Sequence, residues 1–205
     1  MDWKRRERGP AGWPLLFLAM CFFAGILLGQ VLAGRVPSEA GAELDAYLRD
    51  YVALEPELSA QAAFSTLVLY VRYPLMALVL GFVSAGAVLL PVLTAAFGFF
   101  LSFSVCCFTA AFGESGVLLA LAVFGPRCAV TLPCYFLLAV PAWRTASSLA
   151  WASFGRGRRT KRTAPEPGWW RRAAVCGAAL LAGMGIDLLY SPILLQKALE
   201  RVLAR

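Results

Sequence analysis

Two opposite charges stand within apolar segments of this sequence and are the first candidates for chemistry. Arg127 lies near the middle of the apolar run that begins at Val117, and Asp187 lies in the last apolar run. A charged side chain inside a bilayer is costly, so it usually faces the interior of a helix bundle and pairs with an opposite charge. We therefore expect a buried contact between Arg127 and Asp187. The contact would either fix helix packing or belong to a transport path, and packing is favoured because no internal repeat is visible.

The remaining reactive side chains lack the partners that catalysis and metal binding need. The chain contains no histidine, which removes the usual general base and the commonest metal ligand. Its six cysteines all lie in apolar runs, and their spacing matches no zinc site; they are Cys21, Cys106, Cys107, Cys128, Cys134 and Cys176. No serine or threonine has a base nearby, and no glycine-rich phosphate loop is present. We therefore expect a protein that is not an enzyme and has no catalytic residues, cofactor or metal site.

The composition places these residues in a membrane protein. Of the 205 residues, 60% are hydrophobic and 15% are charged, and the mean hydropathy is +0.70. A soluble domain carries about 25% charged residues, and a soluble core of this size leaves much of its area exposed. The sequence therefore predicts a single all-α domain over residues 1–205, a polytopic helix bundle in the cell membrane.

Five apolar runs have about the length that a membrane-crossing helix needs, which is roughly 20 residues. They predict spans at about residues 13–33, 67–90, 92–112, 117–143 and 173–195. The second and third spans come from one continuous apolar run, in which Gly81, Gly86 and Pro91 give the chain a place to reverse. We expect the helix to break at Pro91, because proline removes a backbone donor.

Two of the spans carry packing motifs. In the fourth span Pro126, Pro133 and Pro141 recur every seven or eight residues, so this helix is expected to be kinked or locally broken. In the first span Gly25 and Gly29 form a GxxxG motif, which permits another helix to approach closely. That helix belongs to this chain by default, although the same motif could join copies in a homo-oligomer or contact another membrane protein.

The charged residues between the spans predict the orientation of the chain. Basic residues gather within the first eight residues and in the loop 144–172, and the net charge is +7. Basic loops are retained in the cytoplasm, so we expect both regions inside, held by anionic lipid together with the Trp169–Trp170 pair. Nucleic acid is not an expected partner, because no binding motif accompanies the charge. Five crossings then put the carboxyl terminus outside, although Lys197 and Arg201 in the tail oppose this orientation.

The segment 34–66 is acidic and is expected on the outer, extracytoplasmic side. Ser38 is a suitable helix start, and leucine and tyrosine then recur at helical spacing up to Leu54. An amphipathic helix is therefore expected within residues 38–57. Its apolar stripe rests on the membrane or on the bundle, or it meets a partner, and the first two are favoured.

The order of these features resembles a known family. A basic start, a first span ending in GILLG (25–29), an external helical segment and a pair of spans precede a fourth span, which reads VFGP at 123–126, TLP at 131–133 and VPA at 140–142. This organisation covers most of residues 12–195 and resembles the stage II sporulation protein M family. Members of that family usually carry a polar residue after the fourth-span proline. Here Arg127 and Cys128 follow Pro126, so no role is carried over to that position.

The resemblance implies a non-catalytic membrane scaffold of endospore-forming bacteria. Such a scaffold would recruit and localise stage II sporulation proteins D and P, which hydrolyse peptidoglycan during engulfment of the forespore, and would lie at the sporulation septum. A second class stays open from the residues themselves. Arg127, Asp187 and the proline-rich fourth span also suit a small permease or the membrane subunit of a multi-component transporter.

Overall fold

The structure is a computed structural model that describes residues 12–35, 60–112, 114–153 and 168–203. These residues form five helices: α1 (Trp13–Ala33), α3 (Ala60–Leu80), α4 (Gly86–Phe112), α5 (Glu114–Ser153) and α6 (Trp169–Leu203). The amphipathic helix expected within 38–57, the basic start and the basic run 156–162 lie outside the described residues. No strand occurs in the described part, so the all-α prediction is confirmed there.

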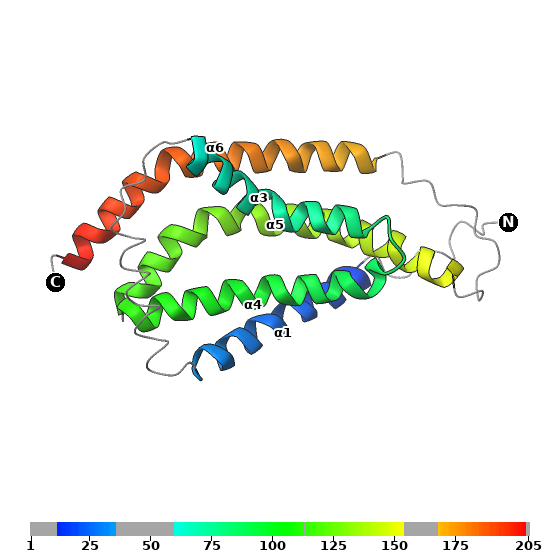
Figure 1. Cartoon of the computed structure of the whole chain (residues 1–205), viewed down its shortest axis with the longest axis horizontal. Helices are drawn as coiled ribbons and strands as arrows, with labels where there is room; N and C mark the ends of the chain where they lie inside the picture. Colours follow the sequence, from blue (N-terminus) through cyan, green and yellow to red (C-terminus); the bar gives the residue numbers. More distant parts are fainter. Residues whose placement is uncertain (1–11, 36–59, 113, 154–167, 204–205) are drawn as a thin grey trace.

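Successive helices run in opposite directions along one common axis (Figure 1). The helices α1 and α4 lie side by side and run the same way, whereas α3 and α5 run back against them. The helix α5 contacts all four others, and α6 packs on α5 and α3 at the edge away from α1. The molecule is therefore a bundle with α5 at its centre.

Three helical segments are long and apolar enough to cross a membrane among the residues that the structure describes. They are Trp13–Ala33, Gly86–Ala110 and Phe124–Ser153, and α3 adds a shorter apolar stretch, Phe64–Leu80. Their outward side chains are apolar: Met20 is 65% exposed in α1, and Val88 is 69% exposed in α4. Large apolar side chains are exposed in this way when lipid is the solvent. The chain is therefore a helical membrane bundle.

The break between the second and third predicted spans is not at Pro91. The structure turns at residues 81–85, and Pro91 lies inside α4. Pro91 cannot donate to the carbonyl oxygen of Ala87, one turn before it, but the indole Nε1 of Trp143 on α5 donates to that oxygen at 3.0 Å. Because a neighbouring helix supplies the missing donor, α4 continues through the proline.

The turn at residues 81–85 depends on close backbone approach. A Cβ atom added to Gly86 would collide with the carbonyl oxygen of Leu80, and one added to Gly81 would lie 2.8 Å from Cβ of Ala142 on α5. Only glycine lets α3 and α4 reverse so tightly against α5. The glycines, not the proline, mark the reversal.

Three further helix boundaries differ from the predicted spans. The loop expected at 144–172 is shorter, because α5 continues to Ser153 and α6 begins at Trp169. Arginine and alanine are good helix formers, so a helix need not end where the apolar run ends. Hydroxyl groups also bond within the extension of α5, where Thr145 Oγ1 donates to the Pro141 carbonyl oxygen at 3.0 Å. At the other end of α6 the expected tail, 196–205, continues the helix to Leu203.

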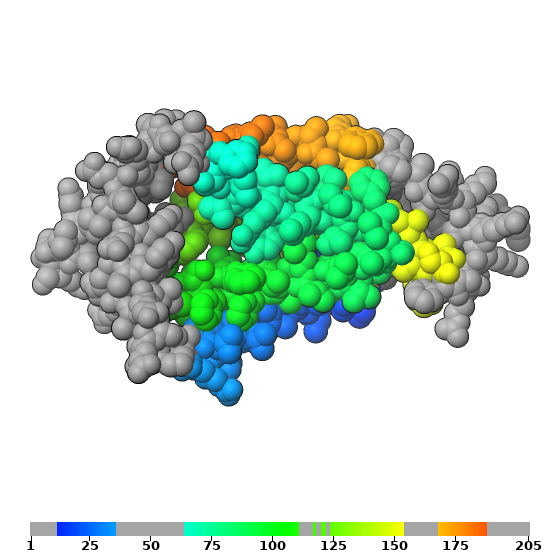
Figure 2. All heavy atoms as spheres, in the orientation of Figure 1, coloured from blue at the N-terminus to red at the C-terminus, as the bar shows by residue number. Residues whose placement is uncertain are grey.

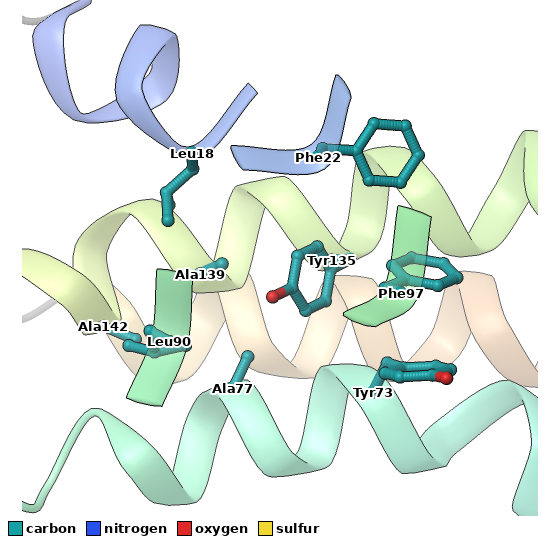
Figure 3. Close-up of a cluster of buried hydrophobic side chains, with 9 residues drawn as sticks. All are labelled: Leu18, Phe22, Tyr73, Ala77, Leu90, Phe97, Tyr135, Ala139 and Ala142. Carbon is teal, nitrogen blue, oxygen red and sulfur yellow. The ribbon is translucent and has the colours of Figure 1, made fainter. Parts of the chain in front are cut away.

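The centre of the bundle is a cluster of aromatic and small side chains (Figure 3). The ring of Phe97 on α4 stacks on Tyr73 of α3, with centroids 4.4 Å apart, and meets Tyr135 of α5 edge-on at 5.3 Å. The hydroxyl groups of Tyr135 and Thr94, both fully buried, lie 2.7 Å apart in a hydrogen bond. Thr94 Oγ1 also contacts the Leu90 carbonyl oxygen at 2.7 Å, so the polar atoms of this core are paired within it.

The GxxxG motif of α1 packs against α4. A Cβ atom added to Gly25 would collide with the carbonyl oxygen of Ala95, and one added to Gly29 would lie 2.7 Å from the carbonyl oxygen of Phe99. Gly98 of α4 makes the reciprocal approach to the backbone of Phe22. These glycines let the two parallel helices touch along their backbones. The motif therefore serves packing within the chain.

Candidate functional site

Three helices bring polar groups together beside the core. Arg127 comes from α5, Asp187 from α6 and Tyr70 from α3. Gly183 of α6 lies tightly against α5, because an added Cβ atom would be 3.0 Å from Val130 Cγ1. This close approach, one turn before Asp187, brings the carboxylate within reach of the guanidinium group.

Arg127 and Asp187 are in contact, as the sequence analysis expects. The Arg127 Nη2 atom lies 3.4 Å from Asp187 Oδ2, and the two side chains are 21% and 8% exposed. A charge-assisted hydrogen bond is usually about 2.7–2.9 Å long, so this ion pair is loose. The loose contact leaves donor capacity on the guanidinium group.

Tyr70 of α3 packs against the ion pair between Arg127 and Asp187. Its side chain is fully buried, and the guanidinium carbon of Arg127 lies 5.5 Å from the centroid of its ring, within range of a cation–π interaction. The Tyr70 hydroxyl donates to the Gly183 carbonyl oxygen at 3.4 Å and interacts with both charged side chains. Tyr70 thus links α3 to the contact between α5 and α6.

Two polar atoms of α5 at this place have no hydrogen-bond partner in the part of the chain that the structure describes. Arg127 Nε and Thr131 Oγ1 are both buried and unsatisfied among the described residues. Thr131 follows Arg127 by one helical turn, so both atoms lie on the same side of α5. Buried polar atoms are usually paired. We call Tyr70, Arg127, Thr131 and Asp187 the polar cluster; its unpaired N–H and hydroxyl groups could hold one carboxylate or carbonyl group.

The polar cluster has an apolar surround. Tyr70 packs with Cys134 and Leu138 of α5 and with Cys176 and Leu180 of α6, all of them buried. The Cys134 thiol lies 3.9 Å from the Cys176 carbonyl oxygen, and all six cysteines are free thiols. A low-polarity environment strengthens the attraction within an ion pair and raises the cost of leaving one charge alone.

The three prolines of the predicted fourth span all lie inside one helix. Pro126, Pro133 and Pro141 are interior residues of α5, which is continuous from Glu114 to Ser153 and visibly bent (Figure 1). Proline bends a helix by removing one bond and crowding the preceding turn. Pro126 directly precedes Arg127, so one of the prolines that can bend α5 lies next to the polar cluster.

Tyr70 and Thr131 were not singled out from the sequence. A useful signal for Thr131 is its spacing of four residues from Arg127, which places the two side chains on one face of a helix. No comparable signal exists for Tyr70, because its contact depends on how α3 lies across α5 and α6.

The two tryptophans at the start of α6, Trp169 and Trp170, have different surroundings. Trp169 is buried, with its ring centroid 5.0 Å from that of Phe82 in the turn after α3, whereas Trp170 is 65% exposed. Arg171 and Arg172, which follow, are exposed. Trp169 therefore anchors α6 to the bundle, and Trp170 with the arginines faces outward, where headgroups would lie.

Comparisons with known proteins found no match to this chain. No protein-family model matches the chain, and no curated protein or solved structure matches it either. The resemblance to the stage II sporulation protein M family therefore rests on the sequence features quoted for it.

Proposed function

We propose that this protein is a non-catalytic membrane scaffold, which holds partner proteins in place rather than converting a substrate. The main support is the way in which its buried polar groups pair across helices. Thr94 bonds with Tyr135, Trp143 bonds with the Ala87 carbonyl oxygen, and Arg127 pairs with Asp187. Such pairing fixes one arrangement of the helices, which suits a rigid platform.

The scaffold crosses the membrane five times in this proposal, with its amino terminus inside and its carboxyl terminus outside. The alternating directions of the five described helices support it (Figure 1). The exposed arginines at the start of α6 support an inner surface that binds anionic lipid. The sporulation septum is the proposed location, and stage II sporulation proteins D and P are the proposed partners, both from the family resemblance.

Deleting the gene in a spore-forming host tests the scaffold. A fluorescent peptidoglycan hydrolase of the engulfment machinery should lose its septal focus in the deletion strain and regain it when the wild-type gene is restored. A hydrolase that stays at the septum without this protein would contradict the proposal. Restoring the gene with both Arg127→Leu and Asp187→Leu adds a second measurement, because a scaffold that still folds should keep the hydrolase in place.

A second function, a small permease or the membrane subunit of a transporter, is favoured by one observation. Arg127 Nε and Thr131 Oγ1 lie on the bent helix α5, and both are buried without a partner among the described residues. Groups of this kind can receive a polar solute. A permease predicts a solute-dependent rise in the thermal unfolding temperature of the purified protein, and this rise should vanish in Arg127→Leu. Hydrolase mislocalisation without any solute effect would leave the scaffold as the function.

A further inference from the structure

The outer face of α3 carries a charge that no described side chain of the bundle neutralises. Side chains at helical spacing point away from the bundle along this helix; they are Ser65, Val68, Leu69, Arg72, Leu75, Met76 and Val79. Four of the apolar ones are 45–53% exposed. Figure 2 shows that no other described helix covers α3 on this side. We call this stripe the Arg72 face.

In the proposed five-span topology, Arg72 lies near the middle of the bilayer. It is the thirteenth of the 21 residues of α3, so a rise of 1.5 Å per residue puts it about 18 Å from the start of the helix and about 12 Å from its end. The hydrocarbon layer is about 30 Å thick. Tyr70, two residues earlier, contacts Arg127, so the two arginines lie at similar depth.

Among the described residues, Arg72 contacts the hydroxyl group and the ring of one tyrosine. Its Nη2 atom donates to the Tyr73 hydroxyl at 3.0 Å, and its guanidinium carbon lies 4.5 Å from the centroid of the Tyr73 ring. Neither contact removes the positive charge. Among the side chains that the structure describes, the only carboxylate is that of Asp187, which already pairs with Arg127. Arg72 and Arg127 therefore share one described carboxylate, which pairs with Arg127.

Charge complementarity identifies what would cover this face. A mid-membrane arginine is rarely left facing lipid, and it is stabilised best by a carboxylate on a neighbouring helix. The Asp187 carboxylate of a second copy could not serve, because its residue is 6% exposed and its charge is taken. The apolar neighbours of Arg72 supply a surface that a transmembrane helix can pack on.

We infer that the Arg72 face binds a transmembrane helix of a different protein, one that carries a glutamate or aspartate near its midpoint. This inference rests on the proposed scaffold function and names the chemistry of its partner. The ion pair would form across the interface between the two proteins, with Tyr73 holding the guanidinium group in place from below. Recruitment would then depend on one charge in α3.

A designed helix can test this without knowledge of the natural partner. The full chain, labelled with a donor dye, is reconstituted in phosphatidylcholine vesicles with an acceptor-labelled polyleucine helix that has one central glutamate. Energy transfer is compared with that for the same helix carrying leucine at the centre. We expect the glutamate helix to associate about tenfold more tightly, a factor equivalent to ~1.4 kcal/mol.

Matched variants assign the effect to Arg72. Arg72→Leu should reduce association of the glutamate helix to the level of the leucine helix, whereas Arg72→Lys should retain most of it. Arg171→Leu removes an exposed arginine at the end of α6 and should change nothing. Arg72→Leu is compatible with folding, because it places an apolar side chain on an outward face; an unchanged thermal unfolding temperature checks this.

Three results would overturn the inference. Equal association of the glutamate and leucine helices would mean that Arg72 reaches lipid phosphate instead. Energy transfer between labelled copies of the chain that Arg72→Leu abolishes would make a second copy the occupant. Association that survives in Arg72→Leu would remove Arg72 from the contact. A scaffold that localises its hydrolase in spite of such a result would still stand, so failure of this inference is separable from failure of the function.

Discussion

Asp187 is the countercharge of Arg127 and lowers the free-energy cost of burying its guanidinium group in the bundle. In Asp187→Asn the guanidinium group keeps its position but loses its countercharge, in surroundings that solvate it poorly. We expect the free energy of unfolding to fall by about 1–3 kcal/mol. Thermal unfolding in detergent micelles measures the loss.

A double-mutant cycle separates the pair from its parts. Arg127→Leu with Asp187→Leu should be less damaging than the sum of the two single changes, with a coupling energy of about 0.5–2 kcal/mol. Strict additivity would mean that the 3.4 Å contact contributes nothing to stability. In that case Tyr70, through its bond to the Gly183 carbonyl oxygen, would be the main link between the helices at this place.

At the scale of residues, the sequence predicts which side chains need partners but not which partners they find. Asp187 is a lone acid in the apolar runs, so an arginine within a span has few other partners; the sequence favours Arg127 as that arginine, although Arg72 also lies in a predicted span. Tyr70 and Thr131 carry no such signal, since tyrosine and threonine are common in membrane helices and most serve packing. Arg72 lies within the predicted second span and is exposed on the outer face of α3, which makes it the more unusual of the two arginines.

Trp143 supplies the hydrogen-bond donor that Pro91 lacks, so α4 stays helical through the proline. Trp143→Phe removes the indole donor and leaves the Ala87 carbonyl oxygen without a partner, in addition to some loss of packing against Phe17. We expect this change to cost about 1–3 kcal/mol, the usual penalty for an unpaired buried polar group. Trp151→Phe, on an exposed position of the same helix, is the control and should cost little.

Replacing Pro91 tests whether Trp143 stabilises α4 as a hydrogen-bond donor. Pro91→Ala restores a backbone N–H that can donate to the Ala87 carbonyl oxygen within α4. The double variant Pro91→Ala with Trp143→Phe should therefore unfold at a higher temperature than Trp143→Phe alone. If the added N–H brings no recovery, the tryptophan acts by packing and the account of why α4 passes through its proline is wrong.

The close approach of α1 to α4 gives a second test at the scale of elements. Gly25→Ala puts a methyl group onto the backbone of Ala95, so the helices must separate, and we expect a loss of about 1–3 kcal/mol. Gly177→Ala in α6 is the matched control, because nothing lies within 4 Å of its added Cβ atom. Alanine favours the helix over glycine by up to about 1 kcal/mol, so the control should hold or gain stability. Equal behaviour of the two variants in thermal unfolding would refute backbone contact at Gly25.

Helix ends were harder to predict from the sequence than helix cores. The apolar run 67–112 requires a reversal, but the choice between Gly81–Gly86 and Pro91 depends on whether a donor from another helix reaches Ala87. That donor, Trp143, lies 56 residues away in the chain. The extension of α5 to Ser153 was missed for a simpler reason: hydropathy marks where a helix leaves lipid, not where its hydrogen bonds end.

At the scale of the whole molecule, composition dictates the class and tertiary contacts decide the arrangement. A chain with 60% hydrophobic residues and 15% charged residues predicts a membrane bundle with little room for another class. It does not predict that α1 lies beside α4 or that α5 is central, because lipid offers the outer faces as good an environment as a neighbouring helix does. Small residues and paired polar groups determine those neighbours, and only Gly25, Gly29, Arg127 and Asp187 could be identified in advance.

The last prediction is the orientation of the bundle in the membrane, on which the position of every loop depends. The helix α1 begins at one end of the molecule and α6 finishes at the other; α6 begins at the same end as α1 (Figure 1). Arg171 and Arg172 belong to the first turn of α6. Because basic ends stay in the cytoplasm, a fluorescent protein inserted between α5 and α6 should fold inside and fluoresce. Alkaline phosphatase fused after Arg205 should be active, because the proposed five crossings put this end of the chain outside.

One further fusion, in the turn 81–85, identifies which helix fails to cross if the pattern is different. An inactive phosphatase at Arg205 would mean an even number of crossings, and the two helices that could lie out of the membrane are α3 and α6, neither of which meets the length and hydropathy of a full span within the described residues. A fusion in the turn 81–85 reports on α3: phosphatase activity there would mean that α3 does not cross. That result would also move Arg72 out of the hydrocarbon layer and remove its need for a carboxylate partner, whereas failure of α6 alone would leave the Arg72 face intact.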